Sequence, residues 1–210
     1  MRSKADGNTR TFADQARRAQ IVACAIEVIA ELGYPQASIR KIAERVGVAM
    51  SVVLYHFDNK DELVAAIATE LYRALIAVMG PWMAAESTAT GKLRAYIRGN
   101  ALFIHSHRPE YAVLLDIGLT FRSRTGKRLY ELDIAPELQG DLAKLDLESI
   151  LRLGQETGEF RPMHPKSMAL AVRGALNGAV LQVVMEPGFD VLAYGEELVT
   201  TFHQATRRTR

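Results

Sequence analysis

The chain has 210 residues, of which 49% are hydrophobic and 24% are charged, and its formal net charge is +2 at pH 7. This balance excludes a disordered chain, and the length is enough to bury the core of one large or two small domains. The single cysteine, Cys24, excludes an intrachain disulfide and a cysteine-based metal site, and it fits a reducing, cytoplasmic location.

The charge is spread unevenly along the chain. Residues 1–60 carry nine Lys or Arg and six acids, a net charge of +3, whereas the remainder carries 17 bases and 18 acids. A basic excess at one end suits a surface that faces phosphates, but alone it does not establish nucleic-acid binding. No apolar run reaches the ~18 to 20 residues of a membrane span, and the N-terminus lacks the apolar stretch of a secretory signal, so no membrane partner is expected.

The chain begins with a polar segment, residues 1–12, which lacks apolar periodicity and predicts a flexible basic arm. A helix is expected from about residue 14, and Gly33 with Pro35 ends it. Its apolar positions recur at the 3.6-residue spacing of one helix face. They are Ile21, Ala25, Val28, Ile29 and Leu32.

Two short helices, joined at Gly47, are expected next. Ser38 is a good N-cap for the first, and the second runs from about residue 49 to residue 56. Gly47 allows the backbone to reverse, and Ala43 is small enough for the two helices to approach closely. The pair predicts a helix-turn-helix, although an ordinary helical hairpin within a bundle has the same pattern.

Longer helices follow to the end of the chain. Asn59 and Glu62 form a capping-box pattern that begins a fourth helix, and Gly80-Pro81 is expected to end it. No stretch shows the period of two that is typical of strands. The sequence therefore predicts an all-α protein of about nine helices. The remaining helical segments are expected at about 91–106, 110–124, 136–156, 166–185 and 190–206.

The segment "ARRAQIVACAIEVIAELGYPQASIRKIAERVGVAMSVVLYHFDNKDELVAAI" resembles the DNA-binding domain of the TetR family of transcriptional regulators. The rest of the chain matches more loosely, and "GEFRP" before two long terminal helices looks like the closing segment of that family. The matching features occur in the family's order. They are "LGY", Ser38, Ile42-Ala43, Gly47-Val48, Tyr55-His56-Phe57, Asn59-Lys60 and Leu63.

The resemblance implies two domains and a function. Residues 13–60 would form the helix-turn-helix DNA-binding domain, and residues 61–210 a helical bundle that binds a ligand and dimerises. The protein would be a repressor without catalytic residues, cofactor or metal. As a homodimer it would bind a palindromic operator in double-stranded DNA, and a small molecule would release it.

The resemblance also implies which residues contact DNA. The family contacts phosphates at the start of its second helix and reads bases with the start of its third. Two departures affect the reading: position 54 is Leu54 where an aromatic residue is common, and "AMS" is an apolar start for a recognition helix. The implied DNA-binding residues are Ser38, Arg40, Lys41, Ala49, Met50, Ser51, Val52, Tyr55, His56 and Lys60.

A stripe of small residues marks the helix expected at 166–185, where close helix packing between two subunits is one reading and burial within one subunit is another. The stripe is Ala171, Gly174, Ala175 and Gly178. The last helix would offer its own apolar face to the dimer. That face is Leu192, Leu198, Val199 and Phe202.

Bulky side chains between residues 80 and 156 are candidates for lining a ligand cavity, with plain core packing as the alternative for each. "HSHRPEY" contains a His-X-His pattern, but without further ligands at metal spacing a turn with solvated histidines is favoured. The ligand-binding candidates are Trp82, Met83, Phe103, His107, Tyr111, Leu115 and Phe121.

Two other functions compete with a DNA-binding regulator. An enzyme could use Ser106 between two histidines, but the chain has no nucleophile-elbow, zinc-helix or phosphate-loop signature. A helical interaction protein that has lost DNA binding would fit the apolar "AMS" start. Neither explains why a capped, basic module begins the chain, so the regulator is favoured.

Overall fold

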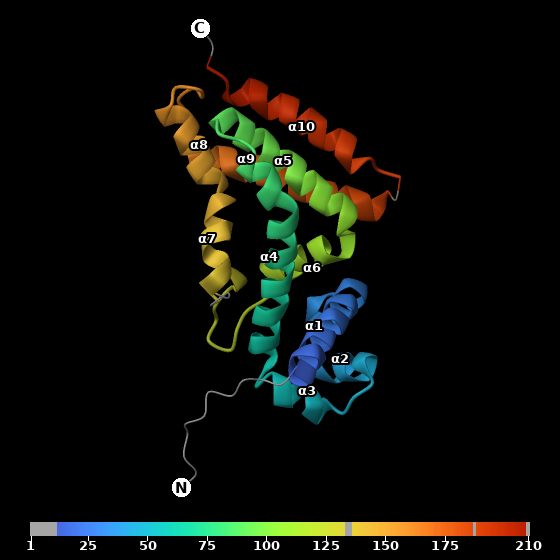
Figure 1. The fold of residues 1–210 in the computed structure, drawn as a ribbon. Helices are drawn as coiled ribbons and strands as arrows, with labels where there is room; N and C mark the ends of the chain where they lie inside the picture. The colour runs from blue at the N-terminus through green and yellow to red at the C-terminus, as the bar shows by residue number, and fades with distance from the viewer. Residues whose placement is uncertain (1–11, 133–135, 187, 209–210) are drawn as a thin grey trace.

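The computed structural model describes residues 12–132, 136–186 and 188–208 (Figure 1). Within these ranges the chain forms ten α-helices, two short 3-10 helices and no strand, which confirms the all-α prediction with one helix more than expected. The predicted arm, residues 1–12, lies outside the described ranges except for Phe12, which is the first residue of α1.

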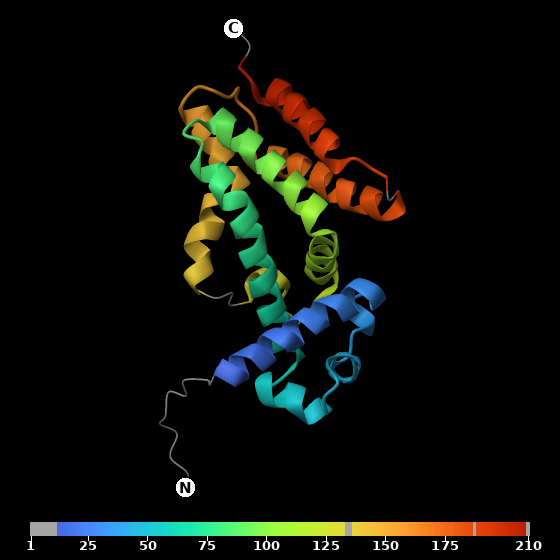
Figure 2. The same ribbon diagram turned by 45° about the vertical axis from the view of Figure 1, so that its right-hand side comes forward.

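The N-terminal unit consists of three α-helices that pack against one another. Helix α1 (Phe12–Leu32) is followed by the 3-10 helix η1 (Tyr34–Gln36), α2 (Ile39–Val46) and α3 (Met50–His56). In Figure 2, α1 lies across this unit, with α2 and α3 beneath it. The helix-turn-helix predicted around Gly47 is therefore confirmed as α2 and α3.

The turns of this unit follow from residues that favour them locally. Gly33 has a φ of 78°, a left-handed conformation that lets the chain leave α1. The Ser38 Oγ accepts a hydrogen bond from the Lys41 backbone N–H at 3.2 Å and so caps α2. Gly47, with a φ of 77°, ends α2 and turns the chain toward α3.

Helix α4 (Lys60–Ala84) is the longest in the described chain. The Asn59 Oδ1 caps it by accepting a hydrogen bond from the Glu62 backbone N–H at 3.0 Å. The predicted break at Gly80-Pro81 is wrong, because the helix continues through Pro81 to Ala84. Pro81 lies only three residues before the end of α4. At this position a proline removes one internal hydrogen bond, and the last turn of the helix still forms.

The C-terminal part contains six further α-helices, which lie beside the upper half of α4 in Figure 1. One segment predicted as a single helix, 136–156, is two helices, because Leu145 and Asp146 interrupt it and Asp146 caps the second. The elements are α5 (Ala89–Ser106), α6 (Arg108–Thr120), η2 (Leu129–Glu131), α7 (Pro136–Lys144), α8 (Leu147–Glu156), α9 (Pro165–Met185) and α10 (Val191–Thr206).

By length and composition α4 could cross a membrane, since an 18-residue window within it has a mean hydropathy of 1.6. This differs from the expectation that no segment is apolar enough. The same composition is what a central core helix needs. Helix α4 contacts α1, α5, α6 and α7, and we therefore interpret its apolarity as core packing.

Two large apolar cores meet along α4. The first joins α1, α2 and α3 to the first half of α4, which contributes Leu63, Ile67 and Leu71, and to α6, which contributes Ile117. The second joins the far end of α4 to α5, α8, α9 and α10. The sequence-based boundary between residues 60 and 61 stays a prediction, and the first core extends across it.

Helices α5 and α10 approach each other closely at Gly195. A Cβ added to this residue would lie 2.7 Å from the Cβ of Ala101 on α5, closer than side chains pack. Glycine at this position therefore sets the distance between the two helices, and with it the placement of α10 on the outside of the bundle.

We expect Gly195→Ala to destabilise the protein by about 1 to 3 kcal/mol, because the added methyl group must push α10 away from α5. Gly140→Ala is the matched control, since nothing lies within 4 Å of that position on α7 and alanine favours the helix. Urea denaturation followed by circular dichroism measures both variants. Equal stability of Gly195→Ala and the unchanged protein would contradict the close approach.

Candidate nucleic-acid interface

The turn between α2 and α3 is held by the backbone. The N–H groups of Gly47 and Val48 both donate to the Ala43 carbonyl oxygen, each at 3.0 Å. This bonding and the left-handed Gly47 fix the angle at which α3 leaves α2. The result is the geometry in which helix-turn-helix proteins present their second helix to the major groove.

The two helices divide their side chains by face. Ile42, Ala43, Val53 and Phe57 are at most 2% exposed and belong to the first core. Tyr55, by contrast, is 73% exposed. The predicted DNA-binding residues divide as follows: Ser38, Arg40, Ala49, Met50, Ser51 and Tyr55 are exposed, Lys41, Val52 and Lys60 are partly buried, and His56 is buried.

The exposed start of α2 offers positive charge beside a helix N-terminus. Arg40 lies in the first turn, and its guanidinium is 3.7 Å from the Glu44 carboxylate in an exposed pair that water screens. Lys41 follows it, and its ammonium forms no ion pair within the described residues. Helix N-termini favour anions, so this corner is suited to a phosphate.

Two predicted contact residues are placed differently from the expectation. His56 is 6% exposed, and its ring packs nearly perpendicular to the Tyr55 ring at a centroid distance of 5.1 Å. The Lys60 Nζ donates to the Tyr34 carbonyl oxygen at 3.3 Å and lies 4.1 Å from the centre of the Tyr34 ring.

Burial around Lys60 lowers the pKa of its ammonium. Its neighbour Tyr34 is also part of a packed corner, where burial, followed by the charges of Asp61 and Asp116, raises the pKa of the phenol to about 12. The Tyr34 backbone N–H donates to the Asp116 Oδ2 at 2.6 Å, and its ring meets Phe121 edge to face. Sequence reasoning missed Asp116, because no local pattern connects α6 with the end of α1.

Several bases of the N-terminal segment are neutralised within the protein. Arg45 donates to Glu31 and also pairs with Glu27, and the hydrogen bonds to Glu31 raise the pKa of its guanidinium. Arg18 pairs with Glu62. Among the described bases of this segment, Arg40 and Lys41 at the start of α2 and Arg17 on the exposed side of α1, which donates to Gln20, remain outside these pairs.

The ligand-binding candidates do not form one group. Phe103, His107 and Tyr111 come together between α5 and α6, with the Phe103 and His107 rings stacked at 4.7 Å, and Leu115 packs against this cluster. The Tyr111 hydroxyl reaches Asn177 on α9 at 3.2 Å. The other three lie apart: Trp82 is exposed at the end of α4, Met83 is buried beside it, and Phe121 belongs to the first core.

A separate groove of about 420 Å³ lies between α4, α5 and α7. Its lining combines apolar side chains with two lysines, Lys92 and Lys144, and two acids, Glu86 and Asp141. Met83 is the sequence-based candidate that lines it. The chain described here contains no group of three or more His, Cys, Asp or Glu side chains that could hold a metal ion.

The known proteins that match this chain are bacterial regulators. A family model for "Bacterial regulatory proteins, tetR family" matches residues 21–67. The Fatty acid metabolism regulator protein of Bacillus subtilis is 31% identical over 147 residues, which cover 68% of this chain and 70% of that protein. The HTH-type transcriptional regulator BetI of Ectopseudomonas mendocina is 35% identical over 86 residues, which cover 40% of this chain and 44% of that protein.

Solved structures share the fold. FadR from Bacillus subtilis in complex with stearoyl-CoA superposes with a TM-score of 0.67 at 23% identity, covering 87% of this chain and 95% of that one. A putative tetR family transcription regulator from Shewanella sp. PV-4 superposes with a TM-score of 0.71 at 16% identity, covering 95% of this chain and all of that one, 100%. These matches extend beyond the N-terminal unit to the C-terminal helices.

The charge distribution at the interface predicts how affinity for DNA depends on salt. Arg40→Met should weaken binding and reduce the slope of log K against log salt by about 0.9, because one phosphate contact is lost. Lys60→Met should leave that slope unchanged, because its ammonium is turned toward Tyr34. Fluorescence anisotropy with a labelled duplex over a KCl series measures both. A reduced slope for Lys60→Met would contradict this expectation and support the phosphate contact of Lys60 that the sequence predicts.

Proposed function

Since this chain belongs to the tetR family of bacterial regulatory proteins and is a DNA-binding transcriptional regulator, we propose that it is a homodimeric repressor, released from a palindromic operator by a small molecule. The observation that carries the proposal is the outward face of α3, which leaves Met50, Ser51 and Tyr55 exposed while Val53 on the same short helix is buried. An exposed face on the second helix of a helix-turn-helix is the surface that enters the major groove of DNA.

In the proposed complex, α3 enters the major groove. Met50 is 49% exposed and would contact thymine methyl groups, and the Ser51 hydroxyl would hydrogen-bond to a base edge. Tyr55 and Arg40, on either side of this reading face, would contact phosphates. Base recognition would therefore combine an apolar contact with few hydrogen bonds.

The proposed dimer uses the uncovered face of α9. Leu170, Leu181 and Met185 on this helix are 71%, 63% and 72% exposed, and a Cβ added at Gly174 or Gly178 would meet nothing within 4 Å. A stripe of small residues flanked by exposed apolar ones allows two copies of α9 to pack closely. Two recognition helices related by this two-fold axis would then match the two halves of a palindrome.

The face expected on α10 needs revision. Leu198 and Phe202 are only 7% and 8% exposed, because they pack into the second core of their own subunit. Leu192 is 39% exposed and remains available to a partner. In the proposed dimer α9 therefore supplies the larger apolar surface, and α10 contributes at its N-terminal end.

We expect Leu181→Glu to give a monomer whose affinity for a palindromic duplex is lower by at least about tenfold, because a charge is placed in the interface. Leu119→Glu introduces the same change at a position on α6 that is 73% exposed, and it should remain dimeric. Size-exclusion chromatography with light scattering gives the mass of each. A Leu181→Glu dimer would exclude the α9 interface.

The groove between α4, α5 and α7 supports the ligand part of the proposal. Ile76, Met83 and Leu145 offer it apolar surface, and Lys92 and Lys144 offer positive charge. A ligand there would touch α4, whose first turn lies next to α3. Binding would favour the position of α4 that suits the ligand, and DNA would be released where that position misaligns the recognition helices.

A similar structure contains stearoyl-CoA, so a long-chain acyl-CoA is the first ligand to test. We expect stearoyl-CoA to weaken binding to a duplex that the protein selects from a random pool, as measured by fluorescence anisotropy. Lys144→Glu should blunt the response, because the charge facing the anionic ligand is reversed, whereas Lys166→Glu on α9 should not. An unchanged affinity with stearoyl-CoA would exclude this ligand class while leaving DNA binding itself intact.

A further inference from the structure

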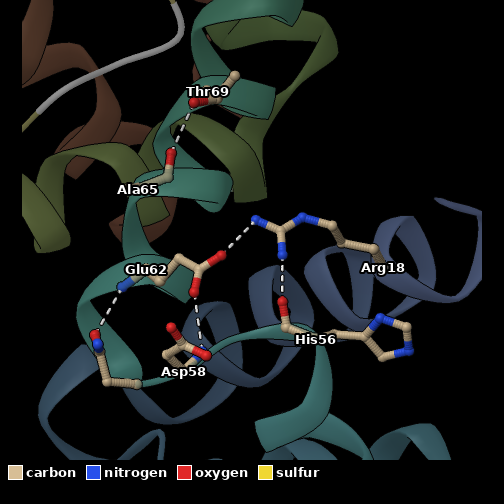
Figure 3. Close-up of polar contacts among 7 residues, drawn as sticks. Arg18, His56, Asp58, Glu62, Ala65 and Thr69 are labelled. Atoms are coloured by element: carbon tan, nitrogen blue, oxygen red, sulfur yellow. Dashed lines mark hydrogen bonds and ion pairs between the residues drawn. The ribbon is translucent and has the colours of Figure 1, made fainter. Parts of the chain in front are cut away.

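Arg18, on α1, joins three segments of the N-terminal unit (Figure 3). One nitrogen of its guanidinium donates to the carbonyl oxygen of His56, the last residue of α3. The other terminal nitrogen lies 3.1 Å from the Glu62 Oε1 in the first turn of α4. The guanidinium carbon Cζ also lies over the Phe57 ring, 4.0 Å from its centre.

Glu62 completes the joint from the side of α4. Its second carboxylate oxygen accepts a hydrogen bond from the Asp58 backbone N–H at 2.9 Å, and its own N–H donates to Asn59. The bond to Asn59 caps α4, and the bond from Asp58 ties the residue before the N-cap to the Glu62 carboxylate. The segment between α3 and α4 is thus held by Glu62 on one side and by Arg18 on the other.

Helix α3 has special need of this contact. It spans seven residues, and Ala49 at its N-cap makes no side-chain hydrogen bond, whereas Ser38 caps α2 and Asn59 caps α4. A short helix without an N-terminal side-chain cap is marginal by itself, so a contact that holds its C-terminal end adds to the turn at Gly47. A guanidinium at that end satisfies a free carbonyl group and complements the negative end of the helix dipole.

We propose that Arg18 is a positioning residue for the recognition helix, which it locks to the first turn of α4, and not one of the bases that bind phosphate. Its side chain is 23% exposed, and both terminal nitrogens are engaged within the protein. Arg18 therefore acts on DNA affinity through the orientation of α3. The proposal rests on the DNA-binding function above.

Because two nitrogens of the Arg18 guanidinium bind two different partners, the proposal can be tested with a variant that keeps the positive charge. Lysine can replace the charge of Arg18, but it cannot bridge a carbonyl group and a carboxylate with two fixed nitrogens. Arg18→Lys should therefore lose about tenfold in affinity for a duplex that the unchanged protein selects from a random pool. Its affinity for a scrambled duplex and its salt slope should stay as they are.

Two further variants separate position from charge. Arg18→Met with Glu62→Gln preserves the net charge, and glutamine can still accept the Asp58 hydrogen bond, so the salt slope should be retained while selective affinity falls. Arg17→Met, one residue earlier and exposed, removes a charge that does not touch α3 or α4 and should keep the preference for the selected duplex.

Hydrogen exchange without DNA tests the joint independently of any function. The amides at the end of α3, including that of Phe57, which donates to the Val53 carbonyl oxygen, should exchange faster in Arg18→Lys than in the unchanged protein. Selection of a duplex by the unchanged protein tests the DNA-binding function, and only the variants test Arg18. Full selective affinity in Arg18→Lys, or a salt slope lowered by about one in the charge-neutral double variant, would overturn the proposal.

Discussion

The structure depends on an apolar core that does not stop where the helix-turn-helix ends. Phe57, at the exit of α3, and Leu63, Ile67 and Leu71, on α4, are each at most 1% exposed within the same cluster. Because a packed interior resists deformation, the direction of α3 is tied to the first half of α4. Helix α4 borders both cores, so in the proposed mechanism a change in the C-terminal helices would reach the DNA-facing surface along it.

Polar contacts within the protein determine which bases of the N-terminal unit are available to DNA. Arg18 and Arg45 are paired with glutamates, and Lys60 is turned onto Tyr34, so three of the bases near the helix-turn-helix serve its internal structure. Arg40 keeps its exposed position. Among the described residues, fewer bases are therefore available to phosphates than the count of lysines and arginines suggests, which in the proposed complex places more weight on the orientation of α3.

Sequence reasoning succeeded where the physical cause is local. The caps at Ser38 and Asn59 and the reversal at Gly47 each depend on residues within one or two turns, and all three were predicted. It could not predict the burial of individual side chains, because the cause of burial is tertiary. The burial of His56 and the division of the predicted DNA contacts depend on which side of a helix meets α1 or α4. The ligand candidates were chosen by size and polarity, which do not distinguish core packing from a cavity lining.

The contact between Tyr34 and Asp116 has a mechanical consequence when taken together with Arg18. The N-terminal unit is tied to the rest of the chain by polar bonds at two places. Arg18 joins Glu62 on α4, and the Tyr34 backbone joins Asp116 on α6 and Lys60 on α4. Bonds at two points do not resist rotation about the line that joins them, so the apolar packing of α1 against α4 and α6 is what opposes a tilt of the unit about this axis.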